Sequence, residues 1–172
     1  MAARCRNGLD FNTDNPTTKG KIMSSLKEDV SAYAEKTARG LLSAGYRADF
    51  TPASLWEIER FFEEQTENGA AKPNGMLSSA LGTWMFGIGA YVGEVVRRSR
   101  GGEWECDDDD PQAEINVELQ LSDGATCWPV QRAMKRFKNG AEDGIAIWAI
   151  ALGLDVGAPP ASRKGFFARL FG

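Results

Sequence analysis

Residues 76–93 read MLSSALGTWMFGIGAYVG, a stretch without a charged side chain that decides the fold. Its apolar side chains recur at steps of three and four residues, which predicts a helix with one long apolar seam. Each glycine inside a helix costs roughly 1 kcal/mol of stability relative to alanine, so close packing must offset the cost. We therefore predict a central helix over about residues 76–98, with other elements pressed against its backbone. The glycines concerned are Gly82, Gly87, Gly89 and Gly93.

Two helices are predicted before this segment. Apolar side chains at helical spacing favour an amphipathic helix over about residues 24–44, closed by Gly45. Thr51-Pro52 supplies a suitable N-cap followed by a proline at the first helical position, so a second helix begins there and ends by Asn68-Gly69. We expect residues 69–75 to form a linker within the domain.

The hydrophobic period changes after the central helix. Apolar and polar residues alternate over residues 115–121, which predicts a half-buried strand. Asp123-Gly124 is a strong hairpin signal, so residues 125–128 should form the partner strand, and residues 103–106 offer a third.

Two more helices, over residues 129–138 and 142–154, complete the prediction. The fold class is α+β: a helical layer around the central buried helix (about 76–98) packs on a small antiparallel β-sheet (about 103–128). A length of 172 residues suits one domain with its own core. We divide the chain into a loose N-terminal lead-in (1–20), a single α+β domain (21–155), and a Pro-rich linker with a basic-aromatic tail (156–172).

The composition excludes several functional classes. The chain contains no histidine, which rules out Ser-His-Asp and Cys-His nucleophile systems, histidine general bases and histidine-ligated zinc. A net charge of −4 gives no overall attraction to nucleic acid. Gly87-Ile88-Gly89 does not follow a predicted strand, and no Walker phosphate-binding sequence occurs. We expect no cofactor, no metal ion and no nucleic acid.

The three cysteines, Cys5, Cys106 and Cys127, are too widely spaced for a CxxC metal or redox motif. One interpretation places Cys106 and Cys127 opposite each other across a hairpin, but we favour buried free thiols and a reducing, cytoplasmic setting. The N-terminus lacks the apolar segment of a signal peptide. Residues 76–93 approach the length of a membrane span, yet their glycines and hydroxyl groups favour close packing in a soluble helix.

Three segments carry a family resemblance. Residues 49–59 read DFTPASLWEIE, residues 89–98 read GAYVGEVVRR, and residues 101–104 read GGEW. This pattern resembles an uncharacterised group of small bacterial proteins, in which a D-[YF]-[ST]-P-x-S-L helix start precedes a GxYxGExxRR…GGxW passage. The resemblance spans about residues 49–130. It implies a bacterial, cytoplasmic, single-domain protein, and it implies no activity, cofactor or catalytic residue.

Glu94 is the most distinctive polar residue. It lies beside the apolar seam, with Arg97 and Arg98 three and four residues further on. A partly buried carboxylate can act as a general acid or base when its pKa is raised, but neighbouring arginines lower that pKa. We favour a structural ion pair. The alternative is a ligand site or a carboxylate-dependent active site formed by Tyr91, Glu94, Arg97, Arg98 and Trp104.

Two acidic segments are candidate contacts for a basic partner. One is the run Asp107, Asp108, Asp109 and Asp110, which lacks the ligand spacing of an EF-hand. We interpret this run as a solvated loop, with a partner contact or metal ligands as alternatives. The other segment lies on the predicted second helix and comprises Glu57, Glu59, Glu63 and Glu64.

Two basic segments follow. The helix after Pro129 should present a solvated basic face, with Met134 and Phe137 pointing inward; protein or nucleic-acid contact are the alternatives. The basic residues of that helix are Arg132, Lys135, Arg136 and Lys138. The tail is a candidate for docking on its own core, on a partner or on a membrane surface, through Phe166, Phe167, Arg169 and Phe171.

These observations together favour a non-catalytic protein-binding domain of the immunity or adaptor type, which acts by surface complementarity. Its partner would be a protein, with a basic surface if the acidic segments form the contact. The alternatives are a carboxylate-dependent enzyme or small-ligand binder centred on Glu94, and a peripheral membrane adaptor that uses the tail.

Overall fold

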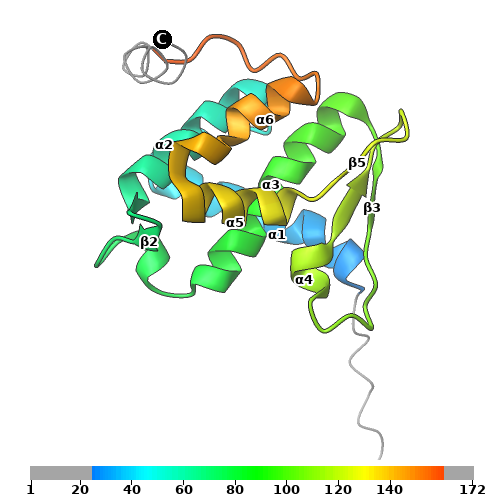
Figure 1. Cartoon of the computed structure of the whole chain (residues 1–172), viewed down its shortest axis with the longest axis horizontal. Helices are drawn as coiled ribbons and strands as arrows, with labels where there is room; N and C mark the ends of the chain where they lie inside the picture. The colour runs from blue at the N-terminus through cyan, green and yellow to red at the C-terminus, as the bar shows by residue number, and fades with distance from the viewer. Residues whose placement is uncertain (1–24, 161–172) are drawn as a thin grey trace, which may run out of the picture.

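The computed structural model describes residues 25–160 of the chain. The predicted lead-in and the tail candidates Phe166, Phe167, Arg169 and Phe171 lie outside the described residues. Within them the predicted α+β class is confirmed, because helices pack on one another and on two small antiparallel sheets (Figure 1).

The elements follow one another with short connections, and three of them are 3-10 turns (η). In chain order they are α1 (Leu26–Ser43), η1 (Pro52–Ser54), α2 (Leu55–Gln65), β1 (Thr66–Glu67), β2 (Ala70–Ala71), η2 (Met76–Ser78), α3 (Leu81–Arg100), β3 (Glu103–Glu105), α4 (Ala113–Asn116), β4 (Glu118–Gln120), β5 (Thr126–Cys127), α5 (Pro129–Asn139), η3 (Gly140–Asp143) and α6 (Ile145–Ala151).

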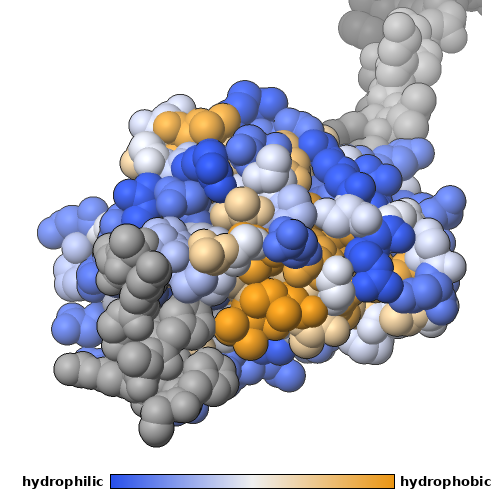
Figure 2. Space-filling view, turned by 90° about the horizontal axis from the view of Figure 1, so that it is seen from above, coloured by the Kyte–Doolittle hydropathy of each residue, from blue (hydrophilic) through white to orange (hydrophobic). Residues whose placement is uncertain are grey.

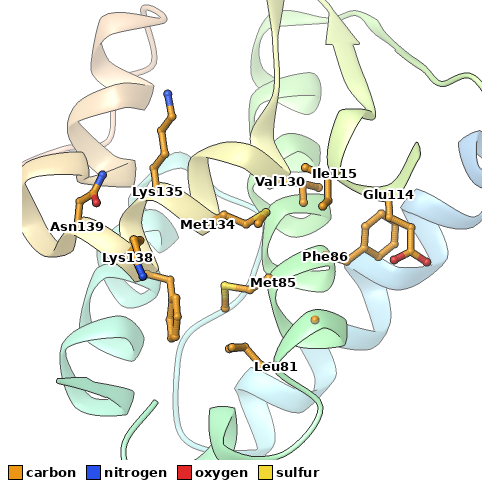
Figure 3. A pocket seen from close by; sticks show the side chains of 12 residues that line it. Leu81, Met85, Phe86, Glu114, Ile115, Val130, Met134, Lys135, Lys138 and Asn139 are labelled. Carbon is orange, nitrogen blue, oxygen red and sulfur yellow. The ribbon is translucent and has the colours of Figure 1, made fainter. Parts of the chain in front are cut away.

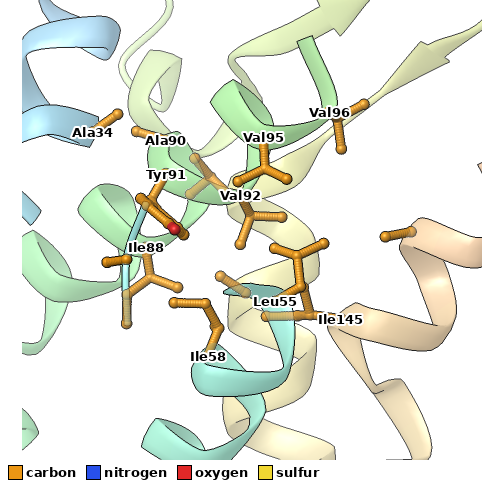
Figure 4. Packing of buried hydrophobic residues seen from close by; sticks show 14 of the residues in the cluster. Ala34, Leu55, Ile58, Ile88, Ala90, Tyr91, Val92, Val95, Val96 and Ile145 are labelled. Carbon is orange, nitrogen blue, oxygen red and sulfur yellow. The ribbon is translucent and has the colours of Figure 1, made fainter. Parts of the chain in front are cut away.

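Helix α3 runs through the middle of the molecule, and α1 and α5 pack along it (Figure 1). Every residue of α3 from 85 to 96 is buried, as expected of a helix covered on more than one side. On one side the valines and isoleucine of α3 meet Leu55 of α2 and Ile145 of α6 (Figure 4). None of the described helices, α3 included, has both the length and the apolar character needed to cross a bilayer. The face of the molecule seen in Figure 2 carries polar side chains over much of its area, around a patch of apolar ones.

The glycines of α3 allow its neighbours to approach closely. A Cβ added at Gly89 would overlap the Cα atom of Val130, at the start of α5. A Cβ added at Gly93 would overlap the ring of Trp104, and one at Gly87 would overlap a side chain of α1. The prediction that other elements press on the backbone of this helix is therefore confirmed.

The central helix begins later than predicted. Residues Met76–Ser78 form the separate turn η2, and α3 starts at Leu81. The hydroxyl of Ser78 donates a hydrogen bond of 2.6 Å to the carbonyl of Gly75, a local bond that competes with helix formation. Ala80 then adopts a left-handed φ of 56°, and a right-handed helix cannot continue through that conformation.

The sheet beside α3 has the antiparallel order β3-β4-β5. Trp104 pairs with Leu119, and Leu119 pairs with Cys127, so three inward-facing side chains share one row. The predicted turn at Asp123-Gly124 connects β4 to β5, with a φ of 87° at Gly124. The hairpin and the strand predicted around Trp104 are confirmed.

The strand predicted over residues 115–121 is wrong in its first half. Ala113–Asn116 form the helical turn α4, and only Glu118–Gln120 pair as β4. The carboxylate of Asp110 accepts hydrogen bonds from the Gln112 N–H at 2.8 Å and from the Asn116 side chain at 2.7 Å. Such local hydrogen bonds, accepted by an aspartate side chain, stabilise a turn in place of strand pairing.

The predicted linker over residues 69–75 contains the second strand of a hairpin. Thr66–Glu67 pair with Ala70–Ala71. Asn68 and Gly69 have φ values of 52° and 73°, the signs that a type I′ turn requires. The Asn-Gly dipeptide carried this signal in the sequence, and the prediction used it only as a helix end. The last helix, α6, is also shorter than predicted.

Cys106 and Cys127 are free thiols. Cys127 is buried, and this burial raises the pKa of its thiol to about 12. Cys106 is partly exposed, and burial together with a hydrogen bond to Asp108 raises its pKa as well. The free-thiol prediction is confirmed for these two residues, and burial only for Cys127; Cys5 lies outside the described residues.

We predict that Gly89→Ala and Gly82→Ala change stability in opposite directions. At Gly89 the added methyl group would force α5 away from α3, which we expect to destabilise the fold by about 2 kcal/mol or more. At Gly82 an added Cβ meets nothing within 4 Å, so the gain in helix propensity should stabilise the fold by up to about 1 kcal/mol. Urea denaturation of both variants measures the difference. A Gly89→Ala variant as stable as the wild-type protein, or more stable, would contradict the α3–α5 contact.

Candidate functional site

A large apolar hollow in the described structure is a groove between the first turns of α3 and the later turns of α5, closed at one end by α4 (Figure 3). We call it the α3–α5 groove. Its volume is about 560 Å³. Its lining residues are Leu81, Gly82, Met85, Phe86, Glu114, Ile115, Val130, Met134, Lys135, Phe137, Lys138 and Asn139.

The local sequence explains why this space stays open. Helices α3 and α5 touch where Gly89 meets Val130, and the groove lies beyond that contact, along the earlier turns of α3 and the later turns of α5. Gly82 has no side chain to fill it. Met134, which we expected to point into the core, is 38% exposed and lies across the groove from Met85 (Figure 3).

The charged side chains of the groove lie at its rim. Lys138 and Asn139 stand at one end, and Glu114 stands at the other, beside Phe86 (Figure 3). Lys135 points away from the methionine-lined floor. The side chains of Glu114 and Lys138 are exposed and form no ion pair or hydrogen bond with the described residues.

Arg136 corrects our prediction of a wholly solvated basic face on α5. Its side chain is only 2% exposed, and its Nε atom donates a hydrogen bond of 2.7 Å to Glu59 of α2. Glu59 also accepts hydrogen bonds from the backbone N–H groups of Ile145 and Ala146, at the start of α6. The pair therefore joins α2, α5 and α6, and the Nη2 atom of Arg136 has no partner among the described residues.

This pair was not predicted from the sequence, although one signal was present. Glu59 is one residue after Ile58 and three before Phe62, both of which are fully buried. A carboxylate inside the apolar face of a helix requires a buried partner. The partner itself was not predictable, because it lies 77 residues further along the chain in a run of basic residues.

Glu94 is buried, with 1% of its side chain exposed, and five donors surround its carboxylate. The indole of Trp104 donates at 2.8 Å, Arg97 donates twice at 2.7 and 3.0 Å, and Arg98 donates at 3.2 Å. The hydroxyl of Ser31, on α1, completes the set at 3.3 Å. A carboxylate offers about four lone-pair sites, so none remains for a ligand.

The surroundings of Glu94 also decide its charge. Burial raises the pKa of Glu94, but the hydrogen bonds from Arg97, Trp104 and Arg98 more than offset it and lower the pKa to about 2. The carboxylate is therefore ionised at neutral pH, which suits a structural anchor and not a proton carrier. Tyr91, the next candidate, lies elsewhere: its hydroxyl contacts Ser54 at 2.6 Å, and burial raises its pKa.

The acidic loop after β3 is held by local hydrogen bonds. Asp108 accepts the backbone N–H of Leu26, at the start of α1, at 3.0 Å. Asp107 accepts the N–H of Asp109, and Asp110 fixes the turn into α4. In the described part of the chain no three carboxylates or thiols converge as a metal ion would require.

The acidic residues of α2 do not form one surface. Glu59 is buried, as described above. Glu57 and Glu64 both interact with Arg60, and Glu64 also accepts a hydrogen bond of 2.6 Å from the hydroxyl of Tyr46. Glu63 has an interaction partner as well. The structure thus brings together the predicted Glu94 cluster, without Tyr91, and leaves the two acidic segments apart.

We predict that Glu94→Gln destabilises the fold in a pH-dependent way. A pKa lowered from 4.5 to about 2 corresponds to roughly 3 kcal/mol of stability. Because the folded-state pKa is the lower one, this stability is present above pH 4.5 and is lost as the pH falls towards 2. Urea denaturation should therefore show that Glu94→Gln lowers the free energy of unfolding strongly at pH 7 and much less below pH 4.

Glu35→Gln is the matched control for this prediction. Glu35 pairs with the same Arg98, but it is 46% exposed, and exposed pairs contribute about 1 kcal/mol or less. Two results would contradict the prediction: Glu94→Gln lowers the free energy of unfolding by no more than Glu35→Gln does, or its effect is the same at pH 2.5 as at pH 7. Either result would show that the negative charge of Glu94 does not stabilise the fold.

Comparison with known proteins leaves the site to be interpreted from its geometry. The chain matches no family model, no curated protein and no solved structure. The resemblance of residues 49–130 to a group of small bacterial proteins therefore stays a prediction.

Proposed function

We propose that this protein is a non-catalytic protein-binding domain, of the immunity or adaptor type, which takes an apolar segment of a partner protein in the α3–α5 groove. The observation that carries the proposal is the groove itself: an open apolar hollow with a volume of about 560 Å³, with the unpaired charges of Glu114 and Lys138 at its two ends. Apolar surface left exposed beside unpaired charges is typical of interaction sites.

The composition of the groove favours a protein segment over a small molecule. Small-molecule sites combine an apolar cavity with a few convergent polar groups that orient the ligand. In the α3–α5 groove the floor is formed by Leu81, Met85 and Met134, which offer no such group. Methionine side chains adapt to differently shaped apolar partners.

The positions of the acidic side chains support a binding role over a catalytic one. Within the groove, Glu114 and Lys138 stand at opposite ends, so they do not form an acid–base pair. The buried carboxylates of Glu59 and Glu94 are outside it and bind arginines. The free thiols Cys106 and Cys127 support a reducing, cytoplasmic setting.

We predict that peptides selected on this protein bind in the groove. A phage-displayed library of random 16-residue peptides is selected on the wild-type protein, and the dissociation constants of selected peptides are measured by fluorescence anisotropy. Gly82→Trp places an indole in the groove, where an added Cβ has free space, and should weaken binding at least tenfold.

Thr83→Trp is the matched control, because Thr83 is exposed on the same turn of α3 but does not line the groove. It should change the dissociation constants less than threefold. Peptides that bind both variants equally would place the binding surface elsewhere. A selection that yields no specific peptide would refute the proposed function.

A further inference from the structure

We infer that the occupant of the groove is an amphipathic helix of the partner protein, bound with its N-terminal end beside Glu114 and its C-terminal end beside Lys138. This inference rests on the proposed function and adds to it the class of occupant and its direction. Three features of the groove carry it: its two helical walls, its length and the opposite charges at its ends.

The walls of the groove are two helices whose contact residues follow helical spacing. Leu81 and Met85 are four residues apart on α3, and Val130, Met134 and Phe137 follow steps of four and three on α5. Side chains at such spacing form ridges, and a third helix can pack its own ridges between them. An apolar stripe at positions i, i+3 or i+4, and i+7 of the partner would meet both walls.

A bound strand would lack the hydrogen bonds that it needs. Strand addition requires an edge with unpaired N–H and C=O groups. The α3–α5 groove is walled by helices, whose backbone groups are paired within each helix except in its first and last turns. Those helix ends do not present the continuous row of groups that a strand edge offers. Helix α5 has eleven residues, so its length is about 16 Å at 1.5 Å per residue, which matches a partner helix of about three turns.

The charges at the two ends select one direction. The N-terminal end of a helix carries partial positive charge and the C-terminal end carries partial negative charge. Glu114 at the α4 end and Lys138 at the other end are exposed and unpaired within the described chain. A helix in the inferred direction meets an opposite charge at each end, and the reverse direction meets a like charge at each end.

The first test concerns charge. Lys138→Glu should weaken the binding of groove-selected peptides at least tenfold at low ionic strength. Lys135→Glu, one turn earlier on α5, makes the same charge change on a side chain that points away from the floor, so it should weaken binding less than threefold. Equal effects of the two substitutions would overturn the assignment of Lys138.

The second test concerns conformation and direction. Circular dichroism of a bound peptide, after subtraction of the free protein, should show helix. A nitroxide label on the N-terminus of the peptide should broaden the amide resonance of Ile115 in α4, and a C-terminal label should broaden that of Asn139. The reverse pattern, or binding without helix, would overturn the inference and leave the proposed function intact.

Two further outcomes would overturn the inference, and the first of them would overturn the proposed function as well. If no selected peptide is sensitive to Gly82→Trp, both fail together. If sedimentation equilibrium shows a dimer that Gly82→Trp dissociates, the groove belongs to a second copy of this chain, and the inference of a partner helix is overturned.

Discussion

The contact of the α3 backbone with Val130 at Gly89 sets the position of the elements around the groove. Val130 lies in the first turn of α5, which follows β5 directly. The contact therefore fixes the position of the sheet and the direction of α5 relative to α3. One turn further along α3, the missing side chain of Gly93 admits the ring of Trp104, whose indole N–H reaches Glu94. In the other direction, along the first turns of α3, the same two helices have the apolar groove between them. The glycines that lower the helix propensity of α3 thus allow the close packing of the core and leave space for the α3–α5 groove.

The two buried carboxylates show why a charge inside a protein need not be a reactive group. Removing a charge from water is costly unless it is paired and hydrogen-bonded. Glu94 meets this condition within short range, because Arg97 and Arg98 follow it on the same helix. Glu59 meets it across the fold, with an arginine of α5 and two N–H groups of α6. In both cases the hydrogen-bond donors that offset the cost of burial also occupy the carboxylate oxygens, so these oxygens are not available to a substrate.

The sequence predicted the structure best where one hydrophobic period ran over many residues. It predicted the structure least well where the hydrogen bonds of a single side chain determine the local conformation. The seam of α3 and the Asp123-Gly124 hairpin are long or distinctive patterns, and both were predicted. The start of α3 depends on a hydrogen bond that Ser78 donates, and the turn α4 depends on hydrogen bonds that Asp110 accepts; periodicity does not reveal either. The Glu94 cluster was found because its members lie close in sequence. The groove was not found, since it is a space between helices and depends on their crossing.

The pair of Glu59 and Arg136 affects how the protein unfolds. Its members come from α2 and α5, and Glu59 also holds the first N–H groups of α6. If α6 alone lifted away, Glu59 would lose those donors while its charge remained buried, a state of high free energy. The short helix α6 is therefore tied to the stability of the whole domain. Its release should be part of a single cooperative transition, not the independent fraying expected of a helix of only seven residues.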